Sequence, residues 1–254
     1  MPRIGCVSYL NAKPLIEGLA DPVRLEVPAR LTRLLQNGEV DIALCPVADI
    51  LLHQDQLESV PVGGISSDGE TLTVKVFSRV PPGEVRHMAL DTDSRTSVNL
   101  MRVLWQERHG FIPAVQPLAV NGALPGEEVD ALLLIGDKVI SGAPDSAAFP
   151  WTLDLGAAWK QATGLPFVFA LWTQRRGDTL GDLPGRLARQ LAINLPRRSA
   201  IADQHAEACG WPPSAGPLAR RYLSRILHYE IGPRELEAIR TFHLRLAALP
   251  TAHP

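Results

Sequence analysis

A polar segment that follows an apolar run is the part of this sequence best suited to bind an anion. Residues 92–97 read TDSRTS and lie between the apolar run MAL and an amphipathic helical pattern. Hydroxyl side chains cap a helix start, and the free backbone N–H groups of the first turn attract anions. The hydroxyls of Ser94, Thr96 and Ser97 and the guanidinium of Arg95 add donors. Taken alone, the segment fits plain helix capping, and an anion site is the alternative.

Other predicted strands also end in polar residues or short turns. They are followed by Asn11, by Cys45–Val47, by SSDGE at 66–70 and by IGD at 135–137. In open α/β sheets, ligands bind outside the carboxyl ends of the strands, so these ends together favour a site. A carboxylate fits better than a nucleotide phosphate, because the sequence has neither G-x-G-x-x-G nor a P-loop. We therefore predict a site for a small carboxylate.

Metal and hydrolase chemistry find little support. The seven histidines show no metal-ligand spacing, and the sequence contains neither H-E-x-x-H nor G-x-S-x-G. We expect no metal and no organic cofactor. Cys6, Cys45 and Cys209 lie far apart, which favours a reducing compartment without disulfides.

Composition and charge limit the partners. The chain has 254 residues and a formal net charge of -2, so it lacks the basic field that gathers nucleic acid or an anionic membrane surface. No run of 18 apolar residues suggests a membrane-spanning helix, and the amino terminus does not resemble a signal peptide. We expect a cytoplasmic protein that binds a small molecule.

Apolar and amphipathic runs alternate in the pattern of parallel sheets covered by helices. One α/β unit occupies the first part of the chain, and a second runs from HMALD to LPFVFALWT, after which the chain is mostly helical. We predict two lobes around a ligand cleft, with crossings near Pro81 and Thr173. Residues 1–82 and 174–254, including the C-terminal helices, would form one lobe, and residues 83–173 the other.

The chain resembles, over nearly its whole length, the chorismate dehydratase family of the futalosine route to menaquinone. The resemblance is specific because several motifs match together: RIGCVSYLNAKPL, VDIALCPV, ISSDGE, SRTSVNL, DALLLIGD and DLGAAWKQATGLPFVFALW. It implies a two-lobed fold of the periplasmic-binding-protein type II class. It also implies that the protein removes water from chorismate to give 3-enolpyruvylbenzoate.

The resemblance further implies roles for individual residues. Asn11 is similar to the family's ring-facing asparagine and would orient the substrate and hydrogen-bond the departing oxygen. Thr73 matches a hydroxyl residue in the strand after the DG turn. The implied carboxylate cradle is formed by Ser94, Arg95, Thr96 and Ser97, and the implied cleft lining includes Ile135, Gly136 and Asp137.

Two questions stay open at this point. The proton is taken either by a carboxylate such as Glu70 or, as we favour, by the substrate's own enolpyruvyl carboxylate. The fold itself does not separate an enzyme from a binding module, such as a solute receptor or an effector domain that binds a small carboxylate without catalysis.

Overall fold

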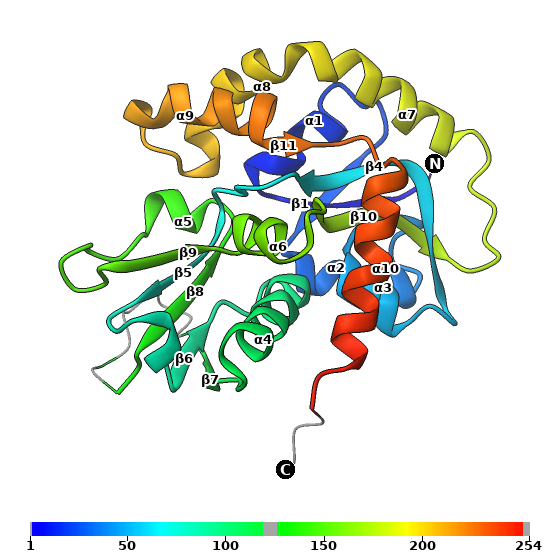
Figure 1. Ribbon diagram of the computed structural model, residues 1–254. Helices are drawn as coiled ribbons and strands as arrows, with labels where there is room; N and C mark the ends of the chain where they lie inside the picture. The colour runs from blue at the N-terminus through cyan, green and yellow to red at the C-terminus, as the bar shows by residue number, and fades with distance from the viewer. Residues whose placement is uncertain (1, 119–125, 127, 251–254) are drawn as a thin grey trace.

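The computed structural model describes residues 2–118, 126 and 128–250 and contains two β-sheets (Figure 1). The first sheet has the strand order β11-β4-β10-β3-β1-β2 and the second β7-β6-β8-β5-β9. The first sheet comprises β1 (Ile4–Val7), β2 (Val23–Glu26), β3 (Ile42–Pro46), β4 (Leu57–Ser67), β10 (Phe167–Arg175) and β11 (Leu227–His228). The second comprises β5 (Val74–Ser78), β6 (His87–Leu90), β7 (Ala114–Pro117), β8 (Ala131–Ile135) and β9 (Trp151–Asp154).

Ten α-helices are found in the described residues. In the first part of the chain they are α1 (Lys13–Ile16), α2 (Pro28–Gln36), α3 (Val47–Leu52), α4 (Arg95–His109), α5 (Lys138–Ser141) and α6 (Leu155–Thr163). After β10 follow α7 (Leu183–Asn194), α8 (Arg198–His205), α9 (Gly216–Arg221) and α10 (Pro233–Ala247). Residues Tyr222–Ile226 form a single turn of π-helix between α9 and β11.

Parallel strands bring the ligand-facing ends of the first sheet to one edge. β1 pairs in parallel with β2 and β3, and all residues of β1 and β3 are buried, as their unbroken apolar runs predict. β10 runs antiparallel between β3 and β4. The carboxyl ends of β1, β3 and β4 therefore lie at the same edge.

The second sheet repeats this arrangement. β6 pairs in parallel with β7 and β8, while β5 runs antiparallel between β8 and β9. The end of β6, the end of β8 and the start of β5 thus share an edge. Figure 1 shows this second lobe below the first, with α7, α8 and α9 across the top of the molecule and α10 along one side.

The C-terminal helices cover the first sheet, as expected from their lack of strands of their own. α7 packs against α1 and β4, and α10 packs against β10 and α3. Phe242 of α10 is 1% exposed and meets the rings of Trp159 and Phe167 edge-on. α10 also contacts α4 of the second lobe, so it touches both lobes.

The chain passes from one sheet to the other at two points. Both points come earlier in the sequence than the expected domain boundaries at 82/83 and 173/174. β5 lies before Pro81 but belongs to the second sheet, and β10 starts at Phe167, before residue 174, but belongs to the first. The proline-rich segment that looked like a crossing forms a short turn, Pro82–Glu84, between β5 and β6. A continuous apolar run such as β10 fits the middle of either sheet, so its pattern does not reveal its partners.

A candidate active site between the lobes

A cavity of about 50 Å³ lies where the two sheet edges meet. Its wall includes Val7 and Pro46 from strand ends of the first lobe and Ile135 from the second. A single water needs about 10–15 Å³ on this measure, so the space between the lobes holds only a few waters. The lining side chains of the two lobes therefore leave little free space between them.

Asn11 lines this cavity and carries an unpartnered oxygen. It sits in the short 3-10 turn Leu10–Ala12 directly after β1 and lines the cavity. Its Oδ1 is buried and has no hydrogen-bond partner among the described residues. Neither that turn nor α1 has a side-chain cap, so Asn11 does not act as a helix cap. A buried acceptor without a donor costs about 1–3 kcal/mol, which is the arrangement expected where a ligand supplies the donor.

Thr73 also lines the cavity and is paired across the lobes with Tyr222. The two hydroxyl oxygens are 2.6 Å apart, and both side chains are buried. Burial raises the pKa of Tyr222 far above its usual value, so its phenol stays protonated. The sequence did not single out Tyr222, because it stands in a helical run where an aromatic side chain is most often part of the core.

The start of α4 both caps itself and faces the cavity. Ser94 is the N-cap, and its Oγ accepts a hydrogen bond from the Ser97 N–H at 3.4 Å. The Ser97 hydroxyl donates to Ser94 Oγ at 3.3 Å, and both serines line the cavity. Capping and cavity lining are therefore combined in the same two residues.

Arg95 and Thr96 are directed elsewhere. Thr96 is fully buried, and its Oγ1 accepts from the Ala48 N–H at 3.0 Å, which joins α4 to the first turn of α3. Arg95 is exposed and lies 3.6 Å from the buried carboxylate of Asp49. The predicted four-residue cradle is thus reduced, at the cavity wall, to its two serines.

Gly136 lines the cavity beneath the ring of Tyr9. Its φ is +71°, and a Cβ there would lie 2.9 Å from Cε2 of Tyr9. The Tyr9 hydroxyl donates to Asp93 at 3.1 Å, so the ring is held from the second lobe. Tyr9 was also missed, although it stands in the motif YLNAKPL that carries Asn11. Only glycine permits both the backbone turn and this close contact.

Asp137, predicted to line the cleft, turns away from the cavity. Its carboxylate is 7% exposed and accepts the Leu10 N–H at 3.0 Å and the Trp211 indole N–H at 2.7 Å. Burial raises the pKa of this carboxyl group, while the two donors oppose the rise. Asp137 therefore joins the second lobe to the first beside Asn11. Trp211 was not identified from the sequence.

Comparison with known proteins assigns the chain to a family. The profile of a family described as "Menaquinone biosynthesis" matches residues 2–248. The chain belongs to this menaquinone biosynthesis family. A chorismate dehydratase of Thermus thermophilus is 34% identical over 230 residues, which covers 83% of this chain and 83% of that protein.

Solved structures confirm the predicted fold class. A protein of Archaeoglobus fulgidus superposes with a TM-score of 0.72 at 17% identity and covers 97% of both chains. The alkanesulfonate-binding protein of Xanthomonas axonopodis pv. citri, bound to MOPS, gives 0.65 at 14% identity over 98% of this chain and 94% of that one. A Candida albicans protein with the generic periplasmic-binding-protein fold gives 0.57 at 11% identity over 100% and 92%.

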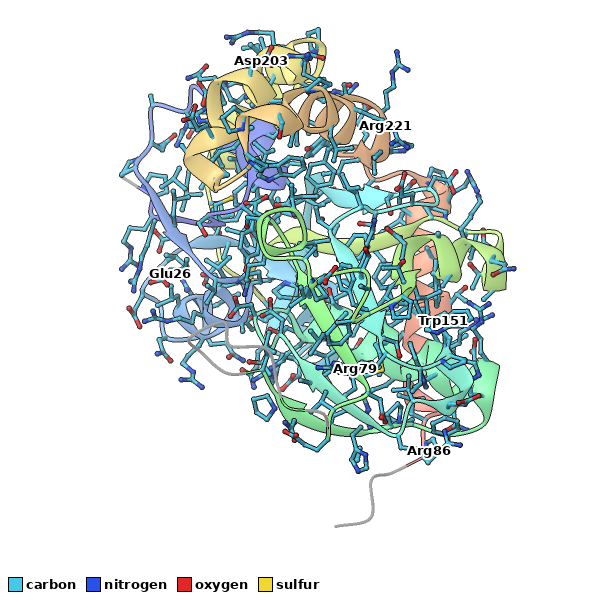
Figure 2. All side chains as sticks on the ribbon, turned by 90° about the vertical axis from the view of Figure 1, so that its left-hand side faces the viewer. Glu26, Arg79, Arg86, Trp151, Asp203 and Arg221 are labelled. Carbon is cyan, nitrogen blue, oxygen red and sulfur yellow. The ribbon has the colours of Figure 1, made fainter. Side chains whose placement is uncertain are left out.

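For this member of the family, the cavity wall combines mostly apolar residues with a few uncharged polar ones. None of its described lining residues is Asp, Glu, His, Lys or Arg. Glu70 stands outside the wall, partly exposed, with its carboxylate 2.8 Å from Arg221. Figure 2 shows Arg221 at the periphery of the upper lobe.

The described part of the chain contains no group of three or more His, Cys, Asp or Glu that could hold a metal ion. Over the same residues no helix is long and apolar enough to cross a membrane. Among the residues that line the cavity, the polar side chains carry hydroxyls and one amide, and most of the others are apolar.

Proposed function

We propose that this protein is a chorismate dehydratase that forms 3-enolpyruvylbenzoate in menaquinone biosynthesis. Family membership and the Thermus thermophilus relative support the assignment. The observation in the structure that supports it most is the unpartnered Oδ1 of Asn11, a residue that lines the same cavity as Thr73. Such a pair suits a ligand hydroxyl, which both donates and accepts a hydrogen bond.

The reaction breaks two bonds on neighbouring ring carbons. The carbon that carries the enolpyruvyl ether loses its hydrogen as a proton, and the next carbon loses hydroxide. The electron pair of the C–H bond becomes the new ring double bond, and proton and hydroxide leave as water. Because the product ring is aromatic, the elimination is downhill and needs positioning more than strong chemical activation.

Asn11 and Thr73 would hold the hydroxyl that departs. In this arrangement Asn11 Oδ1 accepts the hydrogen of the ring hydroxyl, and the Thr73 hydroxyl donates to its oxygen. The donor from Thr73 strengthens as negative charge develops on the leaving oxygen, so it favours the transition state over the bound substrate.

The N-terminus of α4 would bind the ring carboxylate. Ser94 and Ser97 face the cavity there, and α4 is 15 residues long, so its first-turn N–H groups carry the positive end of a full helix dipole. A site made of hydroxyls and helix N–H groups is sufficient for one carboxylate. Arg95 would contribute only at a distance, since its guanidinium turns to Asp49.

The second substrate carboxylate would act as the base. Glu70, the alternative, is paired with Arg221 outside the cavity wall. The enolpyruvyl carboxylate is tethered to the carbon that loses the proton, and such an intramolecular arrangement gives a high effective concentration. On this account the substrate supplies its own base. We further propose that the protein acts in the cytoplasm.

Incubation of the purified protein with chorismate, with and without a chelator, tests the proposal. We expect 3-enolpyruvylbenzoate by chromatography and mass in both samples, and none beyond background with the Asn11→Ala protein. A binding module of the same fold would retain chorismate and return it unchanged, which would refute the assignment. Product that forms only with added metal would keep the reaction but refute the cofactor-free mechanism.

A further inference from the structure

The Tyr222 hydroxyl has one hydrogen-bond acceptor among the described residues. Tyr222 is 1% exposed, and a buried hydroxyl requires an acceptor. Among the described residues, Thr73 Oγ1 at 2.6 Å is the acceptor within hydrogen-bond distance. Tyr222 therefore donates to Thr73.

This assignment leaves the hydrogen of Thr73 free for the cavity. A threonine hydroxyl has one hydrogen and two lone pairs, and here a lone pair is used by Tyr222. No second partner of Thr73 Oγ1 is found in the described part of the chain. Because Thr73 lines the cavity, its hydrogen is directed to whatever occupies that space.

We propose that Tyr222 is a positioning residue that makes Thr73 a hydrogen-bond donor toward the departing hydroxyl of the substrate. The proposal deepens the dehydratase assignment and rests on it. Without Tyr222, the hydroxyl of Thr73 could rotate, because the partner that fixes its orientation would be missing. Tyr222 itself takes no part in bond breaking.

Tyr222 is held in place by contacts that cross the lobes. Its ring stacks on Trp211 with centroids 5.4 Å apart, and Trp211 donates to Asp137 at 2.7 Å. Asp137 and Thr73 belong to the second lobe, whereas Tyr222 and Trp211 belong to the first. The orientation of Thr73 therefore depends on contacts between the two lobes.

A double-mutant cycle tests this role. Tyr222→Phe removes the hydroxyl alone, and we expect kcat to fall about tenfold, the value of one hydrogen bond, with KM changed less than about threefold. Thr73→Val should lower kcat at least as much, and Thr73→Ser should retain it. Because Tyr222 acts through Thr73, the double variant should be no slower than Thr73→Val alone. Tyr229→Phe is the matched control, since the Tyr229 hydroxyl is buried without a partner among the described residues.

The outcomes distinguish the positioning role of Tyr222 from the dehydratase assignment on which it rests. Unchanged kcat in Tyr222→Phe, or losses in the two single variants that multiply in the double variant, would overturn the positioning role while leaving the dehydratase intact. A wild-type protein that does not convert chorismate would overturn both. If Tyr222→Phe does not fold, Trp211→Phe takes its place in the cycle, with the same non-additive loss expected and the same additive result refuting the role.

Discussion

Replacing Asn11 with alanine tests its role in turnover separately from its role in stability. The side chain caps no helix, and its Oδ1 is buried without a partner among the described residues. Removing an unpaired buried oxygen relieves part of a cost of about 1–3 kcal/mol. We therefore expect the Asn11→Ala protein to be as stable as the wild type or more stable. A gain of 1 kcal/mol would raise Tm by about 2–4 °C in a chain of this size.

Turnover of the same variant should collapse. Loss of a preorganised polar contact to a leaving or developing charge costs about 100-fold or more in kcat. Calorimetric unfolding and a chorismate conversion assay on one preparation give both quantities. A drop in stability of about 1 kcal/mol, the value of a lost helix cap, together with near-normal turnover would refute the reasoning.

Asn194 provides the matched control. It is also a buried asparagine, but its Nδ2 donates to the carbonyls of Pro14 at 3.1 Å and Glu17 at 2.7 Å. Asn194→Ala leaves two acceptors without their donor and should lower stability by about 1–3 kcal/mol. Its kcat should stay close to wild type at a temperature where it is folded. The two asparagines are thus expected to respond in opposite ways.

Three further substitutions probe the cavity wall and the base. Ser97→Ala removes a donor to a charged group and should weaken chorismate binding about 10- to 100-fold by calorimetry, which corresponds to roughly 1.5–3 kcal/mol. Gly136→Ala forces a Cβ to 2.9 Å from the Tyr9 ring and should lower both Tm and kcat. Glu70→Gln breaks an exposed ion pair with Arg221; kcat should change less than about twofold and stability by at most about 1 kcal/mol.

The first two substitutions each have a control in which the same residue type is replaced at another position. Ser78 is buried in the same lobe but outside the cavity wall, so Ser78→Ala should leave chorismate affinity unchanged. Gly164 has φ +72° with open space around it, so Gly164→Ala carries the backbone strain without the clash. Equal losses in Gly136→Ala and Gly164→Ala would contradict the role given to the Tyr9 contact, and a large fall in kcat for Glu70→Gln would restore Glu70 as the base.

The sequence predicted the neighbourhood of the site better than the directions of its side chains. Strand ends converge by topology, so Asn11, Ile135 and Gly136 could be placed at one edge from alternation alone. In the helix start SRTS, by contrast, consecutive residues point about 100° apart. Ser94 and Ser97 are three positions apart and share a face of the helix, whereas Arg95 and Thr96 between them point to other faces. Helical spacing would therefore have distinguished the two serines from Arg95 and Thr96.

The missed residues depend on contacts between segments distant in sequence. Tyr222 meets Thr73 across 149 positions, and Trp211 meets Asp137 across 74. No local pattern encodes such pairs, and the π-turn that aims Tyr222 at the cavity resembles any amphipathic helix in the sequence. The predicted boundaries of the lobes differ from the sheets for the same reason, because an apolar strand does not show which strand it pairs with.

The last helix has a consequence for how the lobes can part. α10 packs on β10 and α3 of the first lobe and on α4 of the second, and Arg245 of α10 lies 2.6 Å from Glu107 of α4. Asp137 stands directly before α5, and its partner Trp211 stands shortly before α9. Figure 1 shows α5 and α9 on the side of the molecule away from α10. The lobes are therefore tied at two separate places, and any separation of the lobes has to break the hydrogen bond of Asp137 with Trp211, the α10–α4 contact, or both.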